Sequence, residues 1–343
     1  MKVFETTSDI RVAVIGYGGA FNMGKQHLTE CASVGMTPTA VTDLDEVRLS
    51  VARTDFPGIE TYTSVAAMLG KSEANLIIVI TPHNTHARLA TRCAKAGKHV
   101  VVEKPFAITT TECDRMIDAA KKSGVLLSTY HNRHWDGCIL GAKRRIESGV
   151  IGEVVRIEAR MGGYRKPKNW WRTSRSISGG ILFDWGVHLL EYSLQLIGSA
   201  IVEVTGFATN GVWAEKTAWK DDTNEDEATA IVRFENGAYL SLRMTSLDAN
   251  VKGGVVEVTG AKGSYILDHR TYEIVRPKLK TVTRERGENP ENEHWRFYRN
   301  IADHLVNGAN LIITPERARR AVHILDLAVK SAERGTSLRA KYG

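Results

Sequence analysis

The sequence predicts an α/β protein with two domains: a doubly wound parallel sheet, then an α+β domain built on a large, mostly antiparallel open sheet. Three observations predict this fold. Apolar runs alternate with helical segments in the first third of the chain, a glycine-rich loop follows the first run, and hairpin signals join alternating strands in the second half. We expect the domains to cover residues 1–131 and 132–343.

Length and composition are those of a soluble globular protein. The chain has 343 residues, of which 43% are hydrophobic and 25% charged. No apolar run is long enough for a bilayer, and the N-terminus enters a strand without a signal-peptide pattern. The four cysteines form no C-x-x-C pair, which favours reduced thiols in a cytoplasmic protein over a disulfide or a metal site.

The net charge of +7 is compatible with a nucleic-acid partner, but the pattern does not support one. The basic residues are spread along the chain, and no groove-reading helix or aromatic RNA platform is present. A modestly basic enzyme that handles anionic ligands explains the charge equally well. We therefore expect neither a nucleic-acid nor a membrane partner.

Five apolar runs supply the parallel strands of the first domain. They cover residues 10–16, 37–43, 75–82, 98–105 and 125–132. Runs that are apolar on both faces suit a sheet covered by helices on each side. Between them, segment 85–99 has helical spacing and stops at Gly97. A second helix starts where Thr109 precedes Glu112 by three residues, which is a capping-box pattern, and it stops at Gly124.

Lys104 follows the fourth of these runs. Ligands of doubly wound sheets bind at the carboxyl ends of the strands, and Lys104 lies just past such an end. Pro105 restricts the backbone of the residue before it, so the lysine has fewer ways to point. A surface lysine beside a turn proline produces the same pattern, so this pair alone leaves both interpretations open.

The loop after the first strand carries half of a dinucleotide fingerprint. Gly16 permits a tight turn, and Gly18 lets the backbone approach a pyrophosphate. Phe21 stands where the third glycine belongs. We therefore expect a loop three residues longer than usual, with Gly24 opening the helix whose N-terminus holds the phosphates. This is a Rossmann-type domain.

Asp43 ends the second strand, at the spacing where a carboxylate takes the ribose hydroxyls in this fold. Leu44 follows it, so no adjacent arginine is present to pair a 2′-phosphate. The carboxylate would also repel that phosphate. The sequence therefore favours NAD over NADP as the cofactor.

The second half of the chain is predicted to form a sheet with helices. Segment 141–163 is a helix, a glycine turn and a strand; 227–246 and 253–269 are pairs of strands joined by turns. The helix at 315–334 is a candidate to pack back on the first domain. The open face of such a sheet must be covered or paired, which favours a homodimer or homotetramer. The acidic run at 221–227 is typical of a solvated loop.

Asp184 and His188 are four residues apart. On a helix, this spacing puts both side chains on one face. A carboxylate near an imidazole fixes its tautomer and raises its basicity, as a general base requires. An ordinary helix-surface ion pair has the same spacing, and spacing alone favours that simpler interpretation.

Several stretches together resemble the glucose-fructose oxidoreductase / inositol dehydrogenase / rhizopine catabolism (Gfo/Idh/MocA) superfamily. They are the glycine loop through His27, 81–86, 96–105, 148–154, 179–188 and 314–335. The resemblance implies that Lys104 touches the nicotinamide end of the cofactor and the substrate hydroxyl. It implies that His188 is the acid/base and that Asp184 orients the proton transfer. It also implies that the cofactor lies along four further residues: Thr81, Pro82, His86 and Glu103.

The segment between Glu158 and Asp184 has no acid and six basic residues. The basic residues are Arg160, Arg165, Lys166, Lys168, Arg172 and Arg175. Aromatic faces suit sugar rings, and arginine suits anionic groups. The hypothesis is that the substrate is a neutral or anionic sugar or cyclitol, or a glycoside. We expect it to contact Tyr164, Arg165, Trp171, Arg172, Asp184 and His188. A basic arm at a subunit interface is an equal alternative.

The leading hypothesis is an NAD-dependent dehydrogenase that acts on a secondary hydroxyl or ketone of a sugar, sugar acid or cyclitol. A second is a glycosidase that oxidises a ring hydroxyl transiently with NAD, eliminates the aglycone and returns the hydride. A third is an NAD-sensing regulator without catalysis. The presence of Lys104, Asp184 and His188 argues against the third and does not separate the first two.

Overall fold

The computed structural model describes residues 1–18 and 21–342, which form two compact units. The first unit comprises residues 1–131 and 295–319, and the second comprises 132–294 and 320–343. The chain changes unit after His131, where the sequence places a domain boundary. Residues 295–319 lie in the first unit, whereas the sequence-based division placed them in the second, because their apolar face packs within the first unit.

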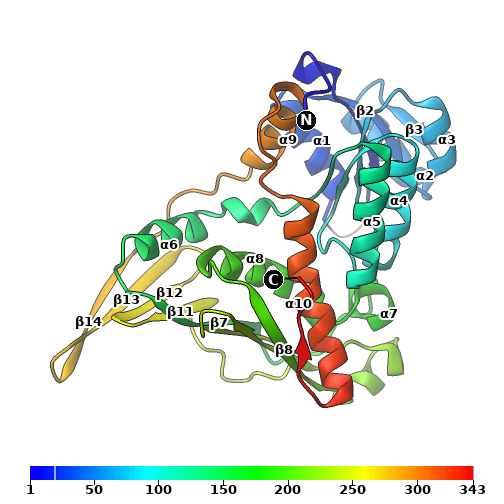
Figure 1. Ribbon diagram of the computed structural model, residues 1–343. Helices are drawn as coiled ribbons and strands as arrows, with labels where there is room; N and C mark the ends of the chain where they lie inside the picture. Colours follow the sequence, from blue (N-terminus) through cyan, green and yellow to red (C-terminus); the bar gives the residue numbers. More distant parts are fainter. Residues whose placement is uncertain (19–20, 343) are drawn as a thin grey trace. The chain divides into compact units, whose positions relative to one another are not determined.

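The first unit contains a six-stranded parallel sheet in the order β3-β2-β1-β4-β5-β6. Figure 1 labels β2 and β3 of this sheet. The strands are β1 (Arg11–Ile15), β2 (Thr37–Thr42), β3 (Glu60–Tyr62), β4 (Leu76–Val79), β5 (His99–Val102) and β6 (Leu127–Thr129). Five of them confirm the predicted runs, and their apolar side chains are buried. β3 has no apolar run and was not predicted; it pairs with the edge of β2.

Helices connect these strands and cover the sheet. They are α1 (Met23–Ser33), α2 (Glu46–Asp55), α3 (Val65–Lys71), α4 (His86–Lys95), α5 (Thr110–Ser123) and α9 (Arg296–Asn307), with short 3-10 turns at Thr7–Asp9 and His83–Thr85. The Thr109 side chain accepts a hydrogen bond from the Glu112 backbone N–H at 3.2 Å, which is the first half of the predicted capping box. The Glu112 side chain accepts from the Ile108 N–H instead of closing the box on Thr109. Because the strand order reverses between β1 and β4, the crossover helices of the two halves lie on opposite faces.

The second unit contains a nine-stranded sheet in the order β14-β13-β12-β11-β7-β10-β9-β8-β15. The strands are β7 (Val154–Gly162), β8 (Ile201–Thr209), β9 (Glu227–Phe234), β10 (Tyr239–Thr245), β11 (Val256–Gly260), β12 (Gly263–Leu267), β13 (Thr271–Lys278), β14 (Thr281–Glu288) and β15 (Leu338–Arg339). All described neighbours are antiparallel except β7 and β10. The sheet is therefore mostly antiparallel, as predicted.

Helices cover one face of this sheet. They are α6 (Gly137–Glu147), α7 (Arg175–Ser178), α8 (Gly186–Leu196) and, from Arg320 onward, α10 (Pro315–Arg334), with 3-10 turns at Asn132–Trp135, Trp171–Thr173, Ile181–Phe183, Ala214–Lys216 and Lys220–Asp222. α8 packs on β7 and β10, and α6 packs on β12 and β13. In the part of the chain that the structure describes, no helix is both long and apolar enough to cross a membrane.

Candidate active site

The glycine loop leaves β1 with its backbone in close approach to the neighbouring strand. Gly16 has φ +95°, and a Cβ atom there would lie 2.3 Å from the Ile80 carbonyl oxygen. A Cβ at Gly24 would lie 2.8 Å from Tyr17 Cα. α1 begins at Met23, so Gly24 lies in its first turn, as the lengthened loop predicts. Residues 19 and 20 of this loop lie outside the described residues.

Two side chains hold the loop in place. Asp43 accepts hydrogen bonds from the backbone N–H groups of Tyr17 (2.7 Å) and Asp45 (3.0 Å). The buried Tyr17 ring anchors the loop to α2, because its hydroxyl donates to Asp55 at 2.9 Å. Burial and the Asp55 carboxylate raise the pKa of Tyr17. Asp43 is half-buried, so its remaining lone pairs stay available to a ribose.

Arg48 is a residue of this site that the sequence did not reveal. Its side chain lies across Gly18, since a Cβ there would be 2.1 Å from Arg48 Cδ. The guanidinium is 3.9 Å from the Asp45 carboxylate. Leu44, next to Asp43, is 91% exposed. The fold thus brings the Arg48 guanidinium to the glycine loop. Arg48 lies five residues beyond Asp43, and no arginine is adjacent to Asp43 in sequence.

Across β1 lies the segment after β4. His86 is fully buried, with its Nε2 atom 2.8 Å from the Thr81 carbonyl oxygen and its Nδ1 atom 2.8 Å from the Pro105 carbonyl oxygen. The Thr81 and Thr85 hydroxyls are 2.6 Å apart. Pro82 precedes the turn that leads into α4. His86 therefore ties the β4 and β5 ends together, and its contact with a cofactor stays a prediction.

Lys104 follows β5 at the carboxyl edge of the same sheet. Its backbone N–H donates to Glu103 Oε2 at 2.7 Å, and the Lys104–Pro105 peptide is cis. Glu103 is only 8% exposed. Burial would raise the pKa of Glu103, but hydrogen bonds from His27 and the charges of His27 and Lys104 outweigh burial and lower it. Glu103 is thus a buried carboxylate directly beside Lys104.

In the second unit, His188 lies in the first turn of α8 and is 4% exposed. Asp184 precedes α8 by two residues and follows the 3-10 turn Ile181–Phe183. The two residues are therefore not on one helix, and the i, i+4 argument does not apply to them. The carboxylate of Asp184 instead accepts a charge-assisted hydrogen bond from Arg172.

The basic segment before Asp184 divides into two parts. The Arg172 guanidinium lies over the Trp171 ring, 4.9 Å from its centroid, and forms an ion pair with Asp184. Tyr164 is 63% exposed and meets Trp213 edge-on at 5.6 Å, and Arg165 is also exposed. The structure thus brings Trp171, Arg172 and Asp184 together and places Tyr164 against an aromatic residue that the sequence did not single out.

The acidic run at 221–227 is not a solvated loop, so that prediction was wrong. Glu225 and Asp226 are 4% and 1% exposed. Glu225 accepts from the Ile181 N–H at 2.9 Å and pairs with Arg175 at 3.3 Å. The Asn224 side chain donates to the Arg172 carbonyl at 2.8 Å. The run therefore supplies a buried carboxylate to Arg175 and a side-chain hydrogen bond to the backbone of Arg172.

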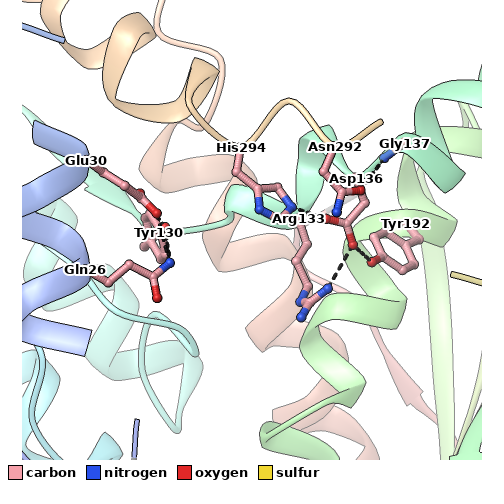
Figure 2. Close-up of polar contacts among 9 residues, drawn as sticks. All are labelled: Gln26, Glu30, Tyr130, Arg133, Asp136, Gly137, Tyr192, Asn292 and His294. Carbon is pink, nitrogen blue, oxygen red and sulfur yellow. Dashed lines mark hydrogen bonds and ion pairs between the residues drawn. The ribbon is translucent and has the colours of Figure 1, made fainter. Parts of the chain in front are cut away.

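Asp136 anchors helix α8. Its carboxylate binds Arg133 at 2.9 Å, the hydroxyl of Tyr192 and the imidazole of His294, as Figure 2 shows. Burial would raise the pKa of Asp136, but hydrogen bonds from His294 and Tyr192 and the charge of Arg133 lower it. Tyr192 lies one turn after His188 on α8, so this cluster fixes the helix.

A group with metal-ligand chemistry overlaps this cluster. Donor atoms of Asp136, Cys138 and His269 lie within 4.8 Å of one another. Arg133 already supplies the positive charge there. Burial, and next the Asp136 charge, raise the pKa of Cys138 to about 12. The arrangement suits a structural cluster.

Replacing Gly16 with alanine should impair both folding and cofactor binding. A non-glycine residue at positive φ costs about 1–2 kcal/mol, and here the Cβ also meets Ile80. Gly58→Ala is the matched control, because Gly58 has φ +87° and nothing within 4 Å of its Cβ position. We expect NADH to bind Gly16→Ala about tenfold more weakly or worse, measured by fluorescence titration, and Gly58→Ala normally. Equal NADH affinity in both variants would contradict this account of the loop.

Comparison with known proteins agrees with this architecture. Residues 10–131 match the family described as "Oxidoreductase family, NAD-binding Rossmann fold". Residues 139–266 match the "GFO/IDH/MocA C-terminal domain". A crystal structure of an NAD-binding protein from Listeria innocua has 26% identity and a TM-score of 0.82, over 98% of each chain.

Two relatives with assigned activities are similar over most of their length. The scyllo-inositol 2-dehydrogenase (NADP(+)) IolW of Bacillus subtilis is 25% identical over 94% of this chain and 94% of that protein. The myo-inositol 2-dehydrogenase of Thermotoga maritima is 28% identical over 86% of this chain and 84% of that protein. The predicted class, a dehydrogenase acting on CH–OH groups, is confirmed at the level of the family. The chain belongs to the Gfo/Idh/MocA oxidoreductase superfamily, with an NAD-binding Rossmann domain followed by the C-terminal domain of that family.

Proposed function

We propose that the protein is an NAD-dependent dehydrogenase that oxidises a secondary hydroxyl of a sugar, sugar acid or cyclitol, or reduces the corresponding ketone. The observation that carries this proposal is Lys104 at the carboxyl edge of the nucleotide-binding sheet, held by Glu103. NAD, when bound, accepts the hydride from the carbon that carries the hydroxyl. Gly16, Gly24 and Asp43 fit this cofactor, because the two glycines admit close approach and the half-buried carboxylate keeps free lone pairs.

The residues of the chain supply the proton chemistry. His188 accepts the hydroxyl proton as the C–H electron pair leaves, and returns it in the reverse reaction. The Lys104 ammonium stabilises the negative charge that develops on the oxygen. Asp184, paired with Arg172, orients a neighbouring hydroxyl. We propose these roles for one shared substrate.

The Arg172–Asp184 pair supports a polyhydroxylated substrate. A guanidinium donates hydrogen bonds and a carboxylate accepts them, so adjacent hydroxyls can satisfy both. Trp171 beside Arg172 offers an apolar face for a sugar ring. Arg165 is exposed, and we propose that it is the cation that a sugar acid would meet.

For the cofactor, we propose NAD rather than NADP. Asp43 would repel a 2′-phosphate, and exposed Leu44 offers it no partner. Arg48 lies over the glycine loop, where a cation can pair with a pyrophosphate or with a 2′-phosphate. The assay below therefore compares NAD with NADP at equal concentration.

In the first test, the purified protein receives NAD or NADP together with a panel of sugars, cyclitols, uronates and glycosides. The reduced cofactor, NADH or NADPH, is followed by its near-ultraviolet absorbance. We expect NADH to grow with one substrate class, with NAD preferred. Lys104→Ala should lower kcat by about 10²–10³-fold, the usual effect of removing a donor that stabilises a developing oxyanion. Lys98→Ala is the control, because Lys98 is at the opposite end of β5 and should leave kcat unchanged.

The other outcomes are also informative. Release of an aglycone without net NADH would replace this proposal with the redox-cycling glycosidase. Neither NADH nor aglycone with any member of the panel, despite measurable NADH binding, would support the sensor. Equal activity of Lys104→Ala and the wild type would remove Lys104 from the chemistry.

We further propose self-association through the uncovered face of the nine-stranded sheet. Ile231 and Tyr239 lie on this face and are 38% and 41% exposed. They occupy neighbouring strands, β9 and β10, that pair directly. Light scattering on the same preparation distinguishes a monomer from a dimer or tetramer.

A further inference from the structure

Glu103 lies in a buried polar network that the proposed chemistry does not use directly. Its Oε1 atom is 3.2 Å from His27 Nε2, and its Oε2 atom accepts the Lys104 N–H at 2.7 Å. His27 Nδ1 is 2.5 Å from the Tyr298 hydroxyl. His27 is fully buried and Tyr298 is 1% exposed. The network joins α1, the end of β5 and α9, all within the first unit.

The geometry fixes which nitrogen of His27 carries a proton. A carboxylate only accepts hydrogen bonds, so Nε2 must donate to Glu103. The Tyr298 hydroxyl can either donate to Nδ1 or accept from it, so neutral and charged imidazole both satisfy the network. Glu103 therefore keeps its partner in either state.

Aromatic rings enclose the imidazole and leave it one position. The Tyr130 ring meets His27 edge-on at 4.2 Å, and the Tyr298 ring meets it at 5.9 Å. The Tyr130 hydroxyl in turn donates to Glu30 at 2.6 Å (Figure 2). Such packing locks the orientation of His27, and with it the Glu103 carboxylate.

The same segment is held on its other side. His86 hydrogen-bonds to the carbonyl oxygen of Pro105, the residue after Lys104. Two buried histidines thus fix the backbone on both sides of a half-exposed lysine. This arrangement leaves the Lys104 backbone little freedom, and the position of its ammonium then depends on the side chain alone.

We propose that Glu103, oriented by His27, is a positioning residue: it holds the backbone of Lys104 so that the ammonium group lies where hydride transfer requires it. The inference rests on the proposed function of Lys104. A buried carboxylate is costly unless it is paired, and here one oxygen is paired with His27 of α1 and the other with the Lys104 N–H. Since a displacement of about 1 Å can cost about 10²-fold in rate, loosening this segment should lower kcat far more than it weakens NADH binding.

The test is a kinetic cycle on Glu103 and His27. We expect Glu103→Ala to lower kcat by about 10–100-fold, with the KM for NAD and the NADH Kd within about threefold. Glu103→Gln keeps an acceptor for Lys104 and should restore most of the rate. His27→Ala should resemble Glu103→Ala, and the double variant should lose little more, because coupled residues are not additive.

Glu112 provides the matched control. Its carboxylate accepts the Ile108 N–H at 3.2 Å, so it also holds backbone near this loop, but four residues beyond Lys104. Glu112→Ala should leave kcat unchanged. Thermal unfolding of each variant with NADH separates loss of folding from loss of rate. If Glu103→Ala fails to fold, His27→Asn and Tyr298→Phe carry the test.

Three results would overturn the inference while leaving the function intact: wild-type kcat in Glu103→Ala, a kcat loss explained by weaker NADH binding, or additive effects of Glu103 and His27. If the wild type oxidises nothing, the proposed function itself fails. The rate at which an amine-specific reagent modifies Lys104 in the NADH complex then tests the positioning without turnover. We expect this rate to change in Glu103→Ala and not in Glu112→Ala; an unchanged rate contradicts the inference.

Discussion

His188→Ala is expected to lower kcat by about 10²–10⁴-fold, the range that removal of a general acid or base produces. His188 is the buried imidazole in the first turn of α8, and the proposed chemistry gives it the hydroxyl proton. The NADH Kd should stay within about threefold, because the glycine loop belongs to the other unit. Steady-state kinetics with the best substrate and a fluorescence titration of NADH measure the two quantities.

His323→Ala controls for the loss of a buried histidine. His323 is also 4% exposed and accepts a hydrogen bond from the Lys341 N–H at 3.0 Å. We expect it to cost stability and to leave the kcat of the folded fraction unchanged. His188→Asn, which fills more of the space than alanine, should be as inactive as His188→Ala. Activity near that of the wild type in both His188 variants would exclude the proposed base.

Asp136→Ala is expected to destabilise the second unit by about 3–5 kcal/mol, the cost of removing one partner from a buried ion pair. The Asp136 side chain is 3% exposed and binds Arg133 and His294. Its loss leaves Arg133 without that carboxylate and frees Tyr192 on α8. All tryptophans except Trp295 lie in the second unit, so urea unfolding followed by tryptophan fluorescence reports this unit.

The pH dependence of this contribution has a definite sign. The pKa of Asp136 is lowered in the folded protein, so its stabilisation is fully present above the ordinary value of 3.8. It is lost as the pH falls below that value through the native pKa. Glu285→Ala is the control, since its pair with Arg276 is exposed and should contribute less than about 1 kcal/mol. Equal stability losses in the two variants would contradict the role of the cluster.

The sequence by itself determined the features that depend on short-range pattern. Apolar runs predicted five of the six parallel strands, because a strand buried on both faces needs a continuous apolar stretch. The end of β5 placed Lys104 at the carboxyl edge, and the glycine loop predicted the start of α1 near Gly24. These properties are local, so a few neighbouring residues suffice to specify them.

Only the tertiary structure decided which polar and charged side chains meet. His27 and Tyr298 are 271 residues apart in sequence and 2.5 Å apart in space. The acidic run before β9 was predicted to be solvated, but the fold buries Glu225 and pairs it with Arg175. The fold also gives the Asp184 carboxylate a hydrogen bond from Arg172, which lies 12 residues earlier in the sequence. The sequence shows which side chains carry charge. Burial and long-range packing choose their partners, because a buried charge is tolerated only where the fold supplies an opposite one.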